Sequence, residues 1–586
     1  MLKYELDKLD YFELFSLREE LESVRKPKSK ILLLADCATQ QLTIILRVLF
    51  HLNDYDVEIT ESGFDSIELE VFDSNSLLYN FKPDFIIILM TVQRLRDRFY
   101  NSTTSKVHQL ENEKEKMKQI WETLSERLDS KIVQSNFSLP VENLFGTFET
   151  KTKESFLNYV RQINHFIDLE SSNKDNVTVL DIDKLSSYVG RKNYLDETLW
   201  YHSKTPCALD FIPYISQIII DNIISHKVKS VKCVVLDLDN TLWGGVIGDD
   251  GVDGIALGHL GDGEAFVDFQ HFILELKKRG IILAVCSKNE ESNAKIPFLE
   301  HPEMVLKLDD IAIFIANWDN KADNIKIIKE SLNIGYDSIV FLDDNPYERN
   351  LVRNFLPEVI VPELPEDPAL YVRHISELNL FETSSYTDED KTRSDMYKVE
   401  FERQKLQKKY SNLEDYLISL EMKITLKKFD DFNLPRIAQL IQRSNQFNLT
   451  TKRYSEVECK ALMEDKNIIP LYCKLKDKYG DYGLISVVIL KKIESSFFID
   501  EWIMSCRVLS RGVEQYIMNH VFSLATELNI ESVLGLYSPT SKNSMVKDFY
   551  LKFGFVEKNV VDNKDLEYII STKDYTKKTV YLNKED

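Results

Sequence analysis

Two aspartates one residue apart end an apolar run, and carboxylates at this spacing could take part in catalysis or bind a metal. The stretch VVLDLDNTLWGG contains this pair, Asp237 and Asp239. Further polar candidates follow other stretches of the same region: Thr241, Ser287, Lys321, Asp343 and Asp344. A single pair of this kind is common as polar capping, but the later Ser, Lys and DD make capping an insufficient explanation.

Carboxylates that gather at one place repel each other, and a hard divalent cation is the simplest remedy at neutral pH. Mg²⁺ prefers oxygen ligands and keeps water molecules that a phosphate substrate can replace. We therefore expect a magnesium site that uses Asp237, Asp343 and Asp344. Asp239 would add its backbone carbonyl as a ligand.

The same residues predict roles in phosphoryl transfer. Asp237 would attack phosphorus as the nucleophile, and Asp239 would carry the proton. Thr241, Ser287 and Lys321 would hold phosphate oxygens. The predicted site therefore combines a nucleophile, a proton carrier, a metal and a phosphate cradle.

A parallel sheet must position these residues. Its expected strands are four apolar runs, at residues 231–239, 281–287, 338–344 and 358–364. Between the first two runs, apolar residues from Phe266 to Leu276 recur at helical spacing, which predicts an amphipathic helix that ends at Gly280. Open parallel sheets bind ligands at the carboxyl ends of their strands, where the candidate residues fall.

Two further α/β regions flank this sheet. In the first region we expect strands that begin at residue 30 and at 85–90 and 177–182, and a charged helix at 111–132. The last region, of about 165 residues, also alternates strands and helices. We divide the chain into residues 1–226, 227–370, a helical connector at 371–420, and 421–586. The predicted fold class is multi-domain α/β.

Composition limits the function classes. A chain of 586 residues exceeds one hydrophobic core, so several domains are expected. The net charge of −22 argues against nucleic acid or an anionic membrane as the main partner. We see neither a signal peptide nor a run of ~18 apolar residues, and we expect a cytoplasmic protein. The seven cysteines lack CxxC spacing, so no zinc site or disulfide framework is indicated.

The order DxDxT, S, K and DD resembles the haloacid dehalogenase (HAD) phosphatase superfamily. The longer strings LDLDNTLWGGVIGDDG, AVCSKN, NWDNKADNI and FLDDNPYERNLVR are similar to the FkbH-like family, in HAD subfamily IIIC. This resemblance implies a central HAD-type, Rossmann-like parallel sheet. It also implies an N-terminal SGNH-hydrolase-like domain, related to flavodoxin-like folds, and a C-terminal GNAT-like domain.

The implied N-terminal domain departs from an active SGNH hydrolase. Ala35, Asp36 and Cys37 stand where a GDS nucleophile turn would lie. The later DxxH pair is missing, because Asp196 and His202 have the wrong spacing. We expect a degenerate domain with a scaffold or docking role, and a buried Cys37.

Two C-terminal stretches resemble the GNAT fold. CRVLSRGVEQYI is similar to the turn that cradles a pantetheine pyrophosphate on backbone N–H groups, with Arg507, Ser510 and Gly512 at the signature positions. SPTSKNSMVKDFYLKFGF places Asn543 and Tyr550 at cofactor-side positions. The groove would either transfer acyl groups or receive the arm of a carrier protein.

The activity implied by the FkbH-like family is conversion of 1,3-bisphosphoglycerate into glyceryl-S-acyl carrier protein for polyketide or related biosynthesis. Cys286 could supply a thiol, because Lys288 and a following helix would lower its pKa, or it could be a packed strand residue. Docking of an acidic carrier protein would need a local basic patch. Its candidates are Lys452, Arg453, Arg507 and Arg511.

Two other functions stay open. The chain could be a HAD-type phosphatase of a sugar or acyl phosphate in surface-polysaccharide biosynthesis, in which Cys286 is inert. It could also be a scaffold that docks carrier proteins, with vestigial flanking domains.

Overall fold

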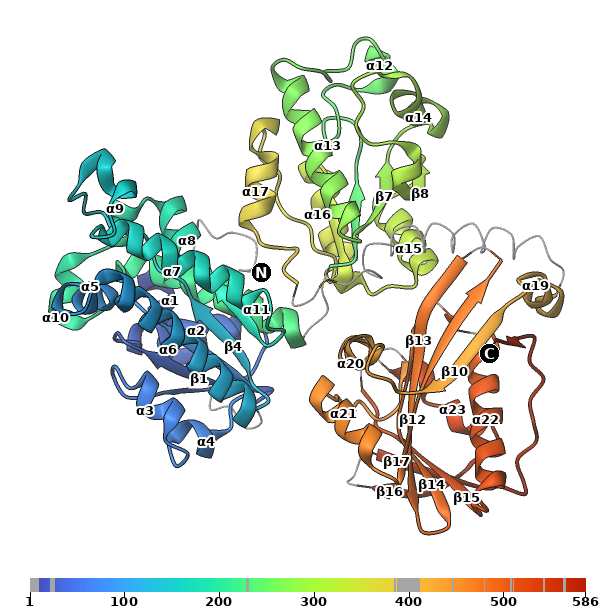
Figure 1. Cartoon of the computed structure of the whole chain (residues 1–586). Helices are drawn as coiled ribbons and strands as arrows, with labels where there is room; N and C mark the ends of the chain where they lie inside the picture. Colours follow the sequence, from blue (N-terminus) through green and yellow to red (C-terminus); the bar gives the residue numbers. More distant parts are fainter. Residues whose placement is uncertain are drawn as a thin grey trace. The chain divides into compact units, whose positions relative to one another are not determined.

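The computed structural model divides the chain into two compact units, which we describe separately. The first comprises Met1–His226 and Glu377–Ser384, and the second comprises Lys227–Ser376 and Ser385–Asp586. The described residues form three sheets, each accompanied by helices, so the predicted multi-domain α/β fold class is confirmed (Figure 1). The structure describes residues 10–21, 27–227, 231–383, 386, 412–444, 447–478, 480–505, 508–509, 511–540, 543–561 and 565–585.

The first unit contains a five-stranded parallel sheet in the order β2-β1-β3-β4-β5. Its strands are β1 (Ser29–Ala35), β2 (Val57–Glu61), β3 (Phe85–Leu89), β4 (Lys131–Ser135) and β5 (Val177–Leu180). The strands expected at residues 30, 85–90 and 177–182 are confirmed. The helix expected over 111–132 is α6 (Lys106–Arg127), which ends earlier because β4 occupies the last residues of that stretch.

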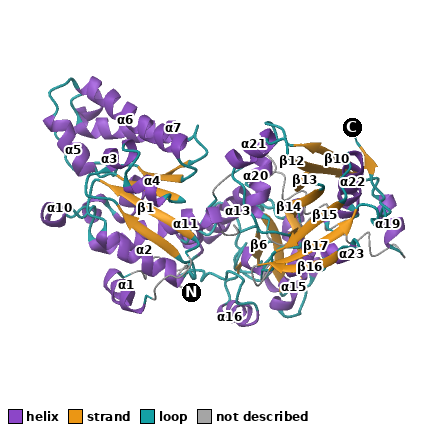
Figure 2. Ribbon diagram, turned by 90° about the horizontal axis from the view of Figure 1, so that it is seen from below, coloured by secondary structure: helices purple, strands orange, loops and turns teal. Residues whose placement is uncertain are grey.

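Helices cover both faces of this sheet (Figure 2). Ile31 and Leu33 of β1 pack in one core with α2 (Gln40–Leu52) and α11 (Ile212–Lys227). Leu32 and Leu34 pack in a second core with α6 and α7 (Phe156–Ser171). Alternate strand residues face opposite sides, so the continuous apolar run of β1 supplies both cores.

The central sheet of the second unit has four parallel strands in the order β8-β7-β6-β9. They are β6 (Cys233–Leu236), β7 (Ile282–Ser287), β8 (Ile311–Ala316) and β9 (Ile339–Leu342). The predicted amphipathic helix is α13 (Asp262–Lys278), and Gly280 follows it with φ +94°. Both predictions, of the parallel sheet and of this helix, are confirmed.

One strand prediction in this region is wrong. Residues 358–364 form no strand, and only a single bridge joins Ile360 to Val340 of β9. Pro362 lacks the N–H that would continue a ladder. The fourth strand is instead β8, whose sequence IAIFIA was not recognised.

The C-terminal part of the second unit forms a nine-stranded mixed sheet, largely antiparallel. Its middle strands are β12 (Ile468–Asp477), β13 (Gly480–Ile493) and β14 (Ser496–Met504), and β14 pairs in parallel with β15 (Ser532–Tyr537). Helices α20 (Leu434–Arg443) and α21 (Glu456–Glu464) share one core with it, and α22 (Val513–Glu527) shares the other. None of the described helices is long and apolar enough to cross a membrane.

Candidate active site

Three carboxylates gather at the carboxyl end of the central sheet. Asp237 directly follows β6, and Asp343 and Asp344 directly follow the neighbouring parallel strand β9. One oxygen from each carboxylate lies within 4.8 Å of the other two, a spacing that could hold a metal ion. Asp237 and Asp343 are both buried. The structure therefore brings together the three aspartates that the sequence predicts to lie close to one another.

Lys321 lies against the carboxylate cluster. It is the first residue of α15 (Lys321–Leu332), and only 2% of it is exposed. Its Nζ lies 2.9 Å from Asp237 Oδ2 and 2.6 Å from Asp343 Oδ2. Burial disfavours the charged ammonium, but these two carboxylates outweigh that effect and raise the pKa of Lys321. Lys321 therefore stays a cation in the site.

The charge of Lys321 does not neutralise the whole cluster. Burial and Asp237 raise the pKa of Asp343 to about 7, although Lys321 opposes them. Asp237 Oδ1 is buried and has no hydrogen-bond partner among the described residues. An unpaired buried carboxylate oxygen is costly, and oxygen donors grouped in this way suit a hard divalent cation. The residues present therefore fit the expected metal.

Asp239 occupies a different environment from the other three aspartates. Its Oδ1 accepts hydrogen bonds from Trp243 Nε1 at 2.9 Å and from the Ile247 backbone N–H at 3.0 Å. Its Oδ2 accepts one from Asn289 Nδ2 at 3.1 Å. Burial raises the pKa of Asp239 despite these bonds. A carboxyl that is held in place and has a raised pKa is suited to the predicted proton transfer.

The predicted phosphate-binding residues lie around the same sheet edge. Thr241 is fully buried, and its Oγ1 accepts a hydrogen bond from the Asp344 backbone N–H at 3.2 Å. Ser287 is the last residue of β7, the strand on the other side of β6. Lys321 contacts Asp237, Thr241 contacts Asp344, and Ser287 ends the strand next to β6, while their phosphate-binding roles stay predictions.

Cys286 does not have the environment that a low thiol pKa requires. It is fully buried, and it packs with Ile282 and Ala284 of β7 in the core that includes α15. Its Sγ lies 3.7 Å from the Lys321 carbonyl oxygen. Burial raises the pKa of this thiol, so the expected lowering is wrong. The structure favours the packed-residue alternative.

Sequence reasoning missed Arg349 and did not predict the partner of Lys288. The buried guanidinium of Arg349 donates to the carbonyl oxygens of Asp343, at 2.8 Å, and of Asp344, at 2.6 Å. Lys288 forms an ion pair with Glu348, with 2.7 Å between Nζ and Oε1. Arg349 and Glu348 belong to the string FLDDNPYERNLVR and Lys288 to AVCSKN, but the strings do not show which atoms meet.

The first unit keeps little of the expected hydrolase geometry. Asp36 and Cys37 follow β1 and are both buried, as expected for Cys37. Asp36 Oδ1 accepts hydrogen bonds from the N–H and the hydroxyl of Thr91, each at 2.9 Å. Asp196 caps α10 (Glu197–Ser203) by accepting from the Leu199 N–H, while His202 is exposed. The degenerate character of this domain stays a prediction.

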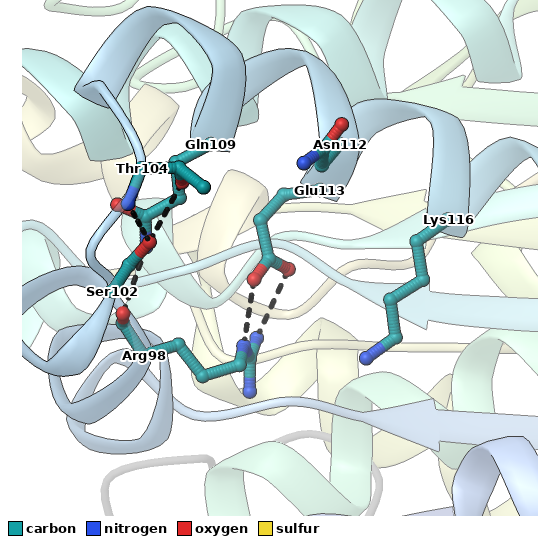
Figure 3. A pocket seen from close by; sticks show the side chains of 7 residues that line it. All are labelled: Arg98, Ser102, Thr104, Gln109, Asn112, Glu113 and Lys116. Atoms are coloured by element: carbon teal, nitrogen blue, oxygen red, sulfur yellow. Dashed lines mark hydrogen bonds and ion pairs between the residues drawn. The ribbon is translucent and has the colours of Figure 1, made fainter.

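A pocket of about 310 Å³ lies between α5 (Val92–Asn101) and α6 in the first unit. In Figure 3 the Arg98 guanidinium faces the Glu113 carboxylate, and Nε donates to Oε1 at 2.8 Å. This pocket contains none of the predicted site residues. Its lining is entirely polar: Arg98, Ser102, Thr104, Gln109, Asn112, Glu113 and Lys116.

The predicted pantetheine residues are only partly described. Gly512 has φ +84° and directly precedes α22. The fully buried Asn543 donates to the carbonyl oxygens of Asn448 and Ser538, each at 2.9 Å. Tyr550 is also fully buried. Arg507 and Ser510 lie outside the described residues, so the pantetheine-binding role of this set stays a prediction.

Three of the four candidate basic residues are described, and each has a partner within the domain. Lys452 pairs with Asp500, and Arg511 pairs with Asp477. Arg453 donates to backbone carbonyl oxygens, including that of Ser444. These side chains are therefore engaged within the domain.

One buried acid of the C-terminal sheet, Glu501, belongs to no motif of the sequence. Glu501 of β14 is fully buried, and its carboxylate accepts hydrogen bonds from Thr450 Oγ1 at 2.8 Å and from the Trp502 N–H at 2.9 Å. Burial raises the pKa of Glu501 to about 7.

Comparison with known proteins shows what this chain is similar to. Residues 30–224 match the family described as FkbH, N-terminal domain. A crystal structure of the N-terminal part of the protein BF1531 from Bacteroides fragilis, containing a phosphatase domain complexed with Mg, is 40% identical. The match covers 64% of this chain and 100% of that chain, with a TM-score of 0.61.

More distant matches concern about a quarter of the chain. The ribosomal-protein-S18-alanine N-acetyltransferase from Escherichia coli is 11% identical over 25% of this chain and 94% of that chain, with a TM-score of 0.21. No curated protein matches the chain. The N-terminal family match and the long alignment with the phosphatase-domain structure establish the relationship: this chain belongs to the FkbH-like family of the haloacid dehalogenase superfamily.

Proposed function

We propose that the chain is a magnesium-dependent phosphatase of the HAD type. The observation that carries this proposal is the buried cluster in which Lys321 contacts Asp237 and Asp343, while Asp237 keeps one unpaired oxygen. The magnesium in the 40% identical phosphatase-domain structure supports the choice of metal. Asp237, Asp343 and Asp344 would hold Mg²⁺ with the Asp239 carbonyl, and the ion would supply positive charge opposite the phosphate.

The chain's own residues account for the remaining chemistry. Asp237 attacks phosphorus through a carboxylate oxygen, and the bond to the leaving oxygen breaks. Lys321 holds Asp237 in position and offers positive charge to the phosphate. The hydroxyl groups of Thr241 and Ser287 donate hydrogen bonds to the phosphate oxygens. Asp239 protonates the leaving oxygen and then accepts a proton from the water that hydrolyses the aspartyl phosphate. The bonds from Trp243, Ile247 and Asn289 keep its carboxyl aimed at the site.

Within this activity we assign a finer function, the conversion of 1,3-bisphosphoglycerate into glyceryl-S-acyl carrier protein. The string similarity to the FkbH-like family supports this choice. A thiolate attacks the acyl carbon, the carbon–oxygen bond to the acyl phosphate breaks, and inorganic phosphate leaves. The other phosphate is a stable monoester, and its removal requires the Asp237 chemistry. The product therefore needs both reactions.

The burial of Cys286 supports the carrier protein's own thiol as the attacking group. A fully buried thiol with a raised pKa is a poor nucleophile, so the pantetheine thiol of the carrier protein would attack directly. The carrier's arm would reach the site from the C-terminal domain, whose predicted groove accepts pantetheine. In this proposal the N-terminal domain serves as a scaffold or docking domain, and the protein acts in the cytoplasm.

The same burial favours a second candidate, a phosphatase that releases phosphate from a sugar or acyl phosphate and loads no carrier. A third candidate, a carrier-docking scaffold, would show neither activity. Intact mass spectrometry of an acyl carrier protein after incubation with the chain, Mg²⁺ and 1,3-bisphosphoglycerate separates them. A glyceryl adduct supports the main proposal, phosphate release without adduct supports the second, and neither result supports the scaffold.

A further inference from the structure

The ion pair between Lys288 and Glu348 spans the carboxyl end of the central sheet. Lys288 directly follows β7, whereas its partner Glu348 lies in α16 (Pro346–Phe355), which follows β9. Strand β6 lies between β7 and β9 in the sheet, so this ion pair joins the two sides of the strand that Asp237 follows. The next residue, Asn289, holds Asp239 Oδ2 and so fixes the same loop beside the end of β6. The Lys288 ammonium therefore lies at the rim of the proposed site.

The two lysines of the site differ in depth and in bonding. The Lys321 side chain is 3% exposed, and its ammonium contacts two carboxylates. The Lys288 side chain is 36% exposed, and Glu348 is its partner among the described residues. An ammonium has three N–H donors, so the contact with Glu348 leaves donors of Lys288 for a ligand. Lys321 serves the reacting phosphate, and Lys288 is accessible to a more distant group of the same molecule.

Glu348 holds the Lys288 ammonium in this position. Its side chain is 7% exposed, and Oε2 is buried without a hydrogen-bond partner among the described residues. A buried carboxylate of this kind needs the cation beside it, which opposes movement of Lys288 away into solvent. The lysine is therefore a positioned donor at the rim, unlike a mobile surface lysine.

We infer that Lys288 binds a second anionic group of the substrate, separate from the phosphate that Asp237 attacks. The substrate class is thus a small phosphate ester that carries a further phosphate or carboxylate. This inference rests on the proposed function and deepens it, since it makes the site selective for doubly anionic substrates. Lys288 acts in specificity, and Glu348 is its positioning residue.

The test compares binding of three-carbon ligands that differ only in the second group: propyl phosphate, the phosphate ester of 3-hydroxypropionate, and propane-1,3-diol bisphosphate. Calorimetry with Mg²⁺ uses the full chain carrying Asp237→Asn, so that no ligand is turned over. The same measurement is made with Lys288→Gln and with Lys295→Gln added to that chain. Lys295 is a matched control, because its side chain is 34% exposed and pairs with Glu291.

We expect the doubly anionic ligands to bind more tightly than propyl phosphate. Lys288→Gln should reduce that preference about tenfold, as loss of a charge-assisted hydrogen bond implies, and Lys295→Gln should leave it unchanged. For each doubly anionic ligand, we compare its affinity relative to propyl phosphate before and after Lys288→Gln. The ligand that loses more of this relative affinity shows whether carboxylate or phosphate is the natural second group. No preference in the parent chain, or an equal preference after Lys288→Gln, would overturn the inference. Because binding is measured without turnover, failure of the phosphatase proposal itself would appear separately, as absent phosphate release by the unmodified chain.

Discussion

At the scale of single residues, the site separates its acids by environment. Asp237 and Asp343 share the Lys321 ammonium, whereas Asp239 is held by neutral donors, including the indole of Trp243 and the amide of Asn289. In the first arrangement an ammonium lies within 3 Å of both carboxylates, beside the oxygens that could bind a metal. The second allows a carboxyl to exchange a proton. In the proposed mechanism, aspartates therefore take different steps because different partners surround them.

The outcome of Cys286→Ala follows from its burial. We expect phosphate release and carrier loading to stay within about twofold of the unmodified chain, because the thiol faces the core. Stability should fall by about 1 kcal/mol through the small cavity. Phosphate assays and intact mass spectrometry of the carrier measure both activities. Loss of loading with normal phosphate release would instead make Cys286 the glyceryl acceptor.

At the scale of elements, close packing in the C-terminal sheet restricts single positions. A Cβ added at Gly535 of β15 would lie 2.2 Å from the ring of Tyr550, which is fully buried. The ring therefore occupies the space above this strand position. Tyr550 belongs to α23 (Phe549–Lys552), so the glycine permits the approach of that helix to the sheet.

Gly535→Ala should therefore destabilise the chain by about 2–3 kcal/mol, because the added methyl group forces the ring or the strand to move. Gly480→Ala is the matched control, since no heavy atom lies within 4 Å of the added Cβ. Chemical denaturation of both variants measures the difference. Similar unfolding free energies for the two would show that the Tyr550 packing described here is incorrect.

Strand β14 carries a pH-dependent penalty through Glu501. Its pKa rises to about 7 in the folded chain because of burial, so the folded state binds this proton more tightly than the unfolded state. The contribution of the protonated acid to stability is present below the unfolded pKa, and it is lost as pH rises through about 7.

Glu501→Gln removes this titration while keeping an acceptor for Thr450. We expect the variant to gain stability relative to the unmodified chain between pH 5.5 and 8, by up to about 3 kcal/mol. Urea denaturation across that range measures the difference. A stability difference that does not change with pH would contradict the raised pKa.

The sequence predicted elements better than contacts. Strands β6, β7 and β9 were recognisable because apolar runs precede the polar residues of the motifs, and Gly280 marked the end of α13. The apolar run at residues 358–364 resembles a strand, but Pro362 has no N–H to donate to a ladder. The pairing of Lys288 with Glu348 depends on the order of the strands in the sheet, and that order cannot be read from one sequence. The direction of Cys286 likewise depends on which face of β7 meets α15.

At the scale of the whole molecule, the two units have separate hydrophobic cores. The cores on the two faces of the first sheet use residues of the first unit only, and the core under the central sheet uses residues of the second unit only. The proposed metal site belongs entirely to the second unit. A ligand that binds only the folded site stabilises the part of the chain that contains it.

Calorimetry of the full chain should therefore show at least two unfolding transitions. Mg²⁺ at about 100 times its Kd should stabilise by about 2.7 kcal/mol the transition that includes the central sheet, and leave that of the first unit unchanged. The combined variant Asp343→Asn with Asp344→Asn should remove the shift. An equal effect of Mg²⁺ on every transition would point to unspecific binding.

The central claim is that Asp237 is the nucleophile of a magnesium-dependent phosphatase. The most direct measurement is phosphate release by the purified full chain and by Asp237→Asn, each with Mg²⁺ and with a chelator. We predict release by the unmodified chain only with Mg²⁺, and a loss of at least about a thousandfold in Asp237→Asn while it stays folded. Release by Asp237→Asn at the rate of the unmodified chain, or release that persists without Mg²⁺, would contradict the claim.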